Sequence, residues 1–331
     1  MDDRKAAILQ AVVEAYIATA QPVGSGAVLR ESAIDVSAAT VRNEMAALER
    51  EGYLTQPHTS AGRVPTEAGY RFFVDQIQVG QSRLSAVEAR RVRSFFEHAR
   101  GEIEQHLDST SKLLSDLTDY AAVVVGPRHD PALVRSIDLV ALSPSDALVV
   151  VVLSDGAVVK HHLDVGRPFD DDVVRRAAMT LRESFVGGTL SSPGEPRPTG
   201  DVAIDDLAAQ ASAALNEPSP GPSYVGGTSR MASQFDAIST VREVLAILEE
   251  QLMVVSLLSD LVDRGLSVAI GSETGLEPLM DCSVVVAPYT VEGEEAGTIG
   301  LLGPTRMDYP KALATVATVS RRLGRSLETN T

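Results

Sequence analysis

The chain has 331 residues, which is too many for one ordinary hydrophobic core, and we therefore expect two or three domains. Apolar residues make up 44% and charged residues 22%, as in globular proteins, and the longest apolar run, Ala147–Leu153, is too short to cross a membrane. The single Cys282 excludes an internal disulfide framework and a multi-cysteine metal site, and it indicates a reducing, cytoplasmic compartment.

The net charge of −16 argues against nucleic-acid binding, because DNA phosphates attract cations. The charge is unevenly distributed, however. Residues 1–80 carry 7 Lys and Arg against 10 Asp and Glu, whereas the other 251 residues carry 22 against 35. Most of the acidic excess therefore lies outside the N-terminal segment, and a DNA-binding module there must place its few cations well.

The N-terminal segment predicts three helices. Apolar residues at three- and four-residue steps indicate a helix over 3–19, which Pro22 and Gly24 end. A short helix follows from about Ser25 to Ser32, and Ser37 is a suitable N-cap for a third helix over Ala38–Glu51.

The third predicted helix has one apolar and one polar face. Its apolar stripe consists of Val41, Met45 and Leu48, and the opposite face carries Ala39, Arg42, Asn43, Ala46 and Arg50. Arg and Asn can make bidentate hydrogen bonds to guanine and adenine edges, and small residues allow a backbone to approach closely. Two short helices followed by a polar-faced third helix indicate a helix-turn-helix.

A two-stranded wing is predicted next, with strands near 53–56 and 63–65 around a turn-rich tip, before a helix capped by Thr66. Residues 1–80 thus predict a winged-helix DNA-binding domain, with a protein-contact module as the alternative. The predicted DNA-contacting residues are Ser37, Ala39, Thr40, Arg42, Asn43, Arg50, His58, Thr59, Ser60 and Arg63. Arg42 and Asn43 would read bases, Ala39 and Thr40 would approach closely, and Arg50 and the wing residues would contact the backbone or minor groove.

The rest of the chain predicts a mixture of helices and strands. Residues 81–120 read as a connecting helix, opened by a capping box at Ser85. Strands are expected at Ala121–Val125, Ile137–Leu142, Ala147–Leu153, Val158–Leu163, Ser267–Ile270, Cys282–Pro288 and Thr298–Leu302, and helices at 170–186, Asp201–Leu215, Thr240–Arg264 and Tyr309–Leu327. Helices that interrupt a run of strands fit an α-rich insertion into an α+β domain.

The predicted helix over Thr240–Arg264 is apolar on most of its faces, which is typical of a buried helix or an oligomer interface. The residues predicted to form a dimer interface there are Val244, Leu248, Leu252, Val255 and Leu258.

No motif in the sequence indicates catalysis. The glycines at 297, 300 and 303 lack the Lys-Ser/Thr of a phosphate-binding loop, and the adjacent His161 and His162 would point to opposite faces of a strand. Cys282 borders an apolar strand and reads as a buried small residue. We therefore expect no enzyme activity, no metal site and no cofactor.

Two sets of residues resemble one known family. Near the N-terminus they are VSAATVRNEM at Val36–Met45 and LTQPHTSAGRVPT at Leu54–Thr66. Near the C-terminus they are IGSE at Ile270–Glu273, Cys282–Val284, and GTIGLLGPTRMDY at Gly297–Tyr309. In order and spacing these runs resemble the HrcA family of heat-inducible repressors.

The resemblance implies a bacterial homodimer that binds an inverted-repeat operator, the CIRCE element, upstream of chaperone operons, with its activity modulated by heat and by the GroEL chaperonin. It also implies three domains, which we place at 1–80 (winged helix), 121–166 with 266–331 (GAF-like) and 167–265 (inserted dimerisation domain). An alternative is a winged-helix regulator controlled by a small-molecule ligand of the GAF-like domain.

Overall fold

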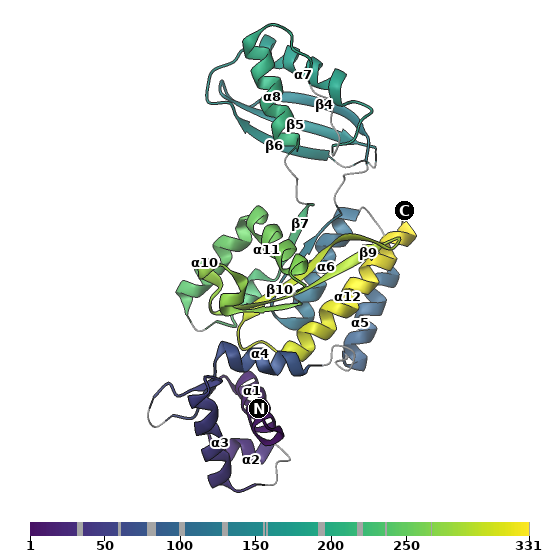
Figure 1. Ribbon diagram of the computed structural model, residues 1–331. Helices are drawn as coiled ribbons and strands as arrows, with labels where there is room; N and C mark the ends of the chain where they lie inside the picture. The colour runs from purple at the N-terminus through teal and green to yellow at the C-terminus, as the bar shows by residue number, and fades with distance from the viewer. Residues whose placement is uncertain are drawn as a thin grey trace. The chain divides into compact units, whose positions relative to one another are not determined.

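The computed structural model describes residues 1–31, 36–58, 61–77, 84–98, 103–127, 132–154, 156, 158–190, 196–216, 221–235, 237–265 and 267–330. These residues form two compact units (Figure 1). The first unit consists of Met1–Gly126 and Pro222–Thr331, and the second consists of Pro127–Gly221.

The N-terminal part of the first unit is a winged helix-turn-helix. Its elements are α1 (Asp3–Thr19), α2 (Ser25–Glu31), α3 (Ala38–Arg50), β1 (Leu54–Thr55), β2 (Val64–Pro65) and α4 (Glu67–Gln76). The side chains of Asp2, Ser37 and Thr66 cap the N-termini of α1, α3 and α4, as expected of short polar residues at these positions. The elements thus match the sequence expectation closely.

The remainder of the first unit is an antiparallel sheet in the order β7-β3-β10-β9-β8. Its strands are β3 (Ala121–Val125), β7 (Ser223–Gly226), β8 (Val268–Ile270), β9 (Cys282–Val291) and β10 (Glu294–Pro304). Its helices are α5 (Ala86–His98), α6 (Ile103–Thr118), α9 (Thr228–Ala232), α10 (Ile238–Glu249), α11 (Gln251–Asp263) and α12 (Tyr309–Asn330), with short 3-10 turns η1 (Gly271–Thr274) and η2 (Glu277–Leu279).

The strand residues of this sheet alternate between two hydrophobic cores, as side chains of a strand must. One face packs on α6 and α12, for example through Val124 and Leu301. The other face packs on α10 and α11, for example through Val123 and Val284. Both faces of the sheet are therefore covered within a single chain (Figure 1).

The second unit contains a three-stranded antiparallel sheet, β4 (Val134–Ala141), β5 (Asp146–Leu153) and β6 (Val158–Asp164), in sequential order. Helices α7 (Asp171–Phe185) and α8 (Val202–Asn216) bury one face of it. The other face has no helix of this unit packed on it among the described residues, and Val140 and Val158 remain 47% and 48% exposed.

The structure divides the chain differently from the sequence expectation. The strands over 134–164 were expected to share a domain with the C-terminal strands, but within the described ranges they pair only with one another. The sheet of the first unit is instead extended by β7, which was not predicted and which pairs with β3. Hydrophobic alternation identifies the buried face of a strand but not the sheet that the strand joins.

The single helix predicted over Thr240–Arg264 is in fact two helices, α10 and α11. They are interrupted at Glu250, where the backbone has φ −84° and ψ 78°. The connecting helix over 81–120 is likewise divided into α5 and α6, and residues 99–102 between them lie outside the described part. Within the residues described, no helix combines the length and apolar character needed to cross a membrane.

Candidate nucleic-acid interface

Helix α3 presents the polar face that its sequence predicts. Val41, Met45 and Leu48 are buried in the core of the module, which fixes the rotation of the helix. The Ser37 hydroxyl accepts a hydrogen bond from the Thr40 backbone N–H at 3.1 Å and so fixes where the helix begins. Of the residues predicted to contact DNA, those exposed on the outer face of this segment are Ser37, Ala39, Arg42, Asn43 and Arg50, and Thr40 is half-buried.

The side chains of Arg42 and Asn43 are exposed and make no hydrogen bond or ion pair with any residue in the described ranges. Arg50 donates from Nε only to the carbonyl of Ala46 one turn earlier, at 3.3 Å. These three side chains therefore keep most of their hydrogen-bond donors available to a ligand. An arginine fork and a carboxamide side by side suit bidentate contacts with base edges.

The acidic residues of the same segment are all paired with cations. Glu44 lies 2.6 Å from the Arg4 guanidinium, and Glu51 forms an ion pair with Lys5, both cations coming from α1. Glu49 lies 2.9 Å from Arg63 at the base of the wing. The hydrogen bond to Glu51 also raises the pKa of Lys5, which keeps this ammonium charged.

These ion pairs explain how a module with an acidic composition could still bind the phosphates of DNA. The negative charge on and beside α3 is compensated locally, while Arg42 and Arg50 are left without a carboxylate partner among the described residues. The outer face of α3 is therefore locally cationic, although residues 1–80 together are acidic.

The wing is anchored to the loop between α1 and α2. Its strands pair Leu54 with Pro65 and Thr55 with Val64, and Arg63 exchanges two backbone hydrogen bonds of 2.9 Å with Val23. Gly62 permits this approach, because a Cβ there would lie 2.5 Å from the backbone C and O of Val23. An isolated β-bridge thus ties the base of the two-stranded wing to this loop.

The wing residues predicted to contact DNA differ in exposure and in their partners. His58 is exposed beside the tip, and Thr59 and Ser60 lie outside the described residues. Arg63 is half-buried and held by Glu49, so its guanidinium links the wing to α3. Sequence reasoning missed the cations Arg4 and Lys5, whose partners lie about forty residues away and carry no local signal.

Four of the five predicted dimerisation residues lie inside the core of the single chain. Val244, Leu248, Val255 and Leu258 are at most 5% exposed, because α10 and α11 pack on the sheet of the first unit. The side chain of Leu252 lies outside the described part. Burial within the chain accounts for the apolar character of these four positions.

Comparison with known proteins decides the family. A family model described as the HrcA protein C terminal domain matches residues 104–313. The heat-inducible transcription repressor HrcA of Pseudarthrobacter chlorophenolicus is 39% identical over 98% of this chain and 99% of its own length. The chain belongs to the HrcA family. HrcA of Nocardia farcinica is similarly related, at 38% identity over 98% of this chain and 97% of its own length.

The family match places the chain among the heat-inducible transcription repressors. It begins in α6 and ends in the first turn of α12, so it includes the strands β3 to β10 but neither α5 nor most of α12. A crystal structure at 2.2 Å resolution, described as that of a hypothetical protein, shares the fold with a TM-score of 0.68, 23% identity and complete coverage of both chains.

Proposed function

We propose that this HrcA-family chain represses chaperone genes as a homodimer that binds an inverted-repeat operator of the CIRCE type, with α3 of each copy in the major groove. The observation that carries the proposal is the pairing pattern on α3. Its carboxylates are neutralised by Arg4, Lys5 and Arg63, while Arg42 and Asn43 are unpaired among the described residues.

The proposed roles follow from exposure and partners. Arg42 and Asn43 read base edges, and Ala39 and Thr40 allow the backbone to approach the DNA. Arg50 and His58 contact phosphates or the minor groove, together with Ser37, Thr59 and Ser60. Arg63 acts through its ion pair with Glu49 and positions the wing, which changes the direct contact expected from the sequence.

We propose that the second unit, rather than α10 and α11, supplies the dimer interface. The open face of its sheet carries Leu148, Val150 and Val152 along β5, with Val140 and Val158 beside them. Strand β5 is apolar on both faces, a pattern typical of strands that are covered on both sides. A second copy of the same face would bury these side chains, and a two-fold axis would then relate the two α3 helices.

We propose that heat and the GroEL chaperonin control the fraction of the repressor that is folded and able to bind DNA. The relatives are named heat-inducible repressors, and a repressor that loses its DNA-competent fold on warming would release its operator. A chaperonin that refolds the repressor would then couple repression to the supply of free chaperonin.

The test is fluorescence anisotropy on an inverted-repeat operator and a scrambled duplex across a salt series. Preference for the operator by about 10³-fold or more, with a steep salt dependence, would support sequence-specific repression. Failure on both duplexes that GroEL reverses would identify a repressor in need of refolding. Failure that persists with GroEL would overturn the proposal.

A single variant tests the role of Arg42. Arg42→Ala should cost about 1–3 kcal/mol on the operator and relax discrimination at one base pair. The matched control is Arg175→Ala, since Arg175 is an exposed arginine on α7 that pairs with Asp172. An equal loss on operator and scrambled DNA would make Arg42 a phosphate contact.

A further inference from the structure

The proposed DNA contacts leave two C-terminal motifs without a role, namely Ile270–Glu273 and Gly303–Tyr309. Both lie against helices of the winged helix. We infer that the first of these motifs is a latch that clamps α4 and thereby fixes the orientation of the winged helix on the C-terminal part of the first unit. The inference rests on the proposed operator binding for its functional consequence, but its geometry stands independently.

The polar half of the latch joins α4 to η1 by two carboxylates. The Arg71 guanidinium donates from Nε to Glu273 Oε1 at 2.8 Å and from Nη2 to the Val268 carbonyl at 2.9 Å. One turn earlier on α4, Glu67 accepts from the Ser272 hydroxyl at 2.5 Å and from the Ser272 N–H at 3.2 Å. The two helix residues thus grip the same 3-10 turn from one side, although about two hundred residues separate them from it.

The turn itself is shaped for this contact. Gly271 adopts φ +52°, and a Cβ there would lie 2.1 Å from Glu67 Oε1, so a side chain at this position would displace Glu67. Glu273 also accepts from the Ile270 N–H at 3.0 Å, which holds its carboxylate facing Arg71. In this motif Gly271 therefore leaves room for Glu67, Ser272 donates hydrogen bonds to Glu67, and Glu273 accepts from Arg71.

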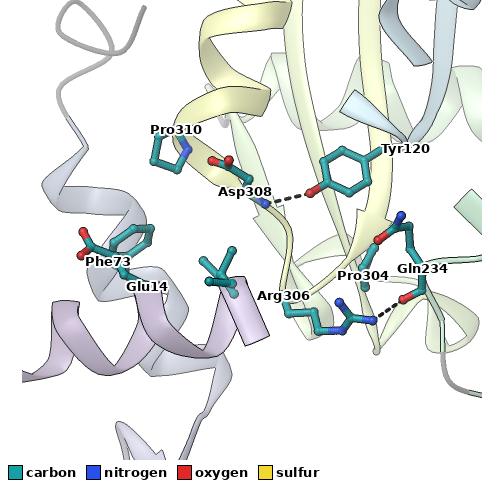
Figure 2. A pocket seen from close by; sticks show the side chains of 10 residues that line it. Glu14, Phe73, Tyr120, Gln234, Pro304, Arg306, Asp308 and Pro310 are labelled. Carbon is teal, nitrogen blue, oxygen red and sulfur yellow. Dashed lines mark hydrogen bonds between the residues drawn. The ribbon is translucent and has the colours of Figure 1, made fainter. Parts of the chain in front are cut away.

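The second motif provides the apolar half of the contact. The rings of Tyr70 on α4 and Tyr309 at the start of α12 lie 5.9 Å apart, and both are buried. Beside them, a cavity of about 370 Å³ separates Glu14 and Phe73 from the loop that carries Arg306 and Asp308 (Figure 2).

Because of this cavity, hydrogen bonds are needed to hold the winged helix against the C-terminal part of the first unit. The loop opposite α1 is tied to its own side, because Arg306 donates to the Gln234 carbonyl at 2.6 Å and the Asp308 N–H donates to the Tyr120 hydroxyl at 2.8 Å (Figure 2). Close packing therefore does not continue across the junction at this point. The orientation of the winged helix depends on the buried side chains of α4, Tyr70 among them, and on the hydrogen-bonded clamp at η1.

A fixed orientation matters for a dimer that must engage two half-sites, which are typically separated by about 34 Å or a multiple of that distance. When both winged helices are held in register, binding of one half-site places the second at a high effective concentration. A loosened latch would leave each winged helix folded and able to bind alone, but the simultaneous engagement of both half-sites would be lost.

The experiment compares Glu273→Ala with Asp75→Ala. Asp75 also contacts Arg71, at 3.5 Å, but it lies on α4 and does not reach η1. On a complete inverted repeat, Glu273→Ala should weaken binding by about ten-fold or more, while a duplex with one half-site should change by less than about two-fold. Arg71→Ala should behave like Glu273→Ala, and the double variant should add little to either.

A role in stability alone would weaken binding to both duplexes equally, and that result would overturn the inference. If the wild type binds neither duplex, the proposed function fails but the latch remains testable.

Spin labels attached at Ala7→Cys and Glu294→Cys, both exposed sites of the first unit, would measure the distance between the winged helix and the C-terminal part of that unit. Dilution with unlabelled protein restricts the measurement to labels within one chain. Glu273→Ala should broaden the distance distribution, and an unchanged distribution would refute the latch.

Discussion

Arg63 at the base of the wing and Glu49 on helix α3 form an ion pair, with 2.9 Å between Nη2 and Oε2. Both side chains are largely shielded, with 16% and 33% exposed. The pair therefore joins the two elements that are proposed to contact DNA, and it removes one negative charge from the neighbourhood of the phosphates.

Glu49→Gln should strengthen binding to any DNA. The amide keeps an acceptor for Arg63 but leaves the guanidinium charge uncompensated and able to neutralise a phosphate. The slope of log K against the logarithm of the salt concentration should therefore steepen by about one unit. Arg63→Ala should have the opposite effect, because Glu49 is then left unpaired beside the DNA. Anisotropy titrations at several salt concentrations measure both variants, and weaker binding by Glu49→Gln would mean that its charge is required to hold the wing.

Gly62→Ala should disrupt the wing. The added Cβ would lie 2.5 Å from backbone atoms of Val23, which cannot move without breaking the Val23–Arg63 bridge. We expect a loss of about 1–3 kcal/mol in the free energy of unfolding, with weaker binding to operator DNA. Chemical denaturation and anisotropy provide the two measurements.

Gly24→Ala is the matched control for that variant, because a Cβ at Gly24 has no neighbour within 4 Å. It should leave both stability and DNA binding close to those of the wild type. Equal effects of the two substitutions would show that loss of glycine flexibility, and not the contact with Val23, is responsible.

Local signals in the sequence predicted the winged helix well. Ser37 and Thr66 are N-caps in the structure, and the buried stripe of α3 falls at Val41, Met45 and Leu48 as its period requires. Such features depend on neighbours within a few residues, so a single sequence contains them. The direction in which Arg42 and Asn43 face could be inferred for the same reason.

Long-range pairings could not be predicted in this way. The ion pairs that neutralise Glu44 and Glu51 join residues 40 and 46 positions apart. The interruption at Glu250 has no proline or glycine to mark it, and it converts one predicted helix into two. The burial of Leu248 and Leu258 against a sheet looks the same in sequence as burial against a second chain.

Val150→Asp should prevent dimerisation. Val150 lies in the middle of β5 on the open face of the sheet, opposite Asp138 on β4 and Lys160 on β6. In the dimer the added carboxylate would be desolvated next to Asp138, so the interface should lose several kcal/mol even though Lys160 lies opposite. Light scattering should report a monomer, and affinity for the complete operator should fall with it.

Val202→Asp is the control for the dimer variant, since Val202 is 76% exposed on α8, which packs on the other face of the sheet. It should remain dimeric. Circular dichroism establishes that both variants are folded, and Val158→Asp provides a second substitution on the open face. A folded, dimeric Val150→Asp protein would exclude this face as the interface.

The buried His106 should lower the free energy of unfolding of the protein in mild acid. Its side chain is buried against Phe95 and Phe96, with ring centroids 6.0 and 5.5 Å away, and its Nε2 has no hydrogen-bond partner among the described residues. Burial lowers its pKa from the ordinary 6.5, because the charged imidazolium is poorly solvated there.

The sign of the effect follows from proton binding. Below pH 6.5 the unfolded chain takes up a proton at His106 that the folded chain refuses, so the free energy of unfolding falls as the pH falls from about 7.5 to 5.5. The contribution of one group is at most about 1.4 kcal/mol per pH unit. His106→Phe, which fits the aromatic surroundings, should remove this component.

Urea unfolding followed by circular dichroism at pH 7.5 and 5.5 measures the difference between the two proteins. The wild type should lose more stability than His106→Phe over this interval. The exposed His98 at the end of α5 provides the control, and His98→Asn should retain the wild-type difference. If His106→Phe lost as much stability in acid as the wild type, the acid sensitivity would have to come from groups outside the contact between α5 and α6.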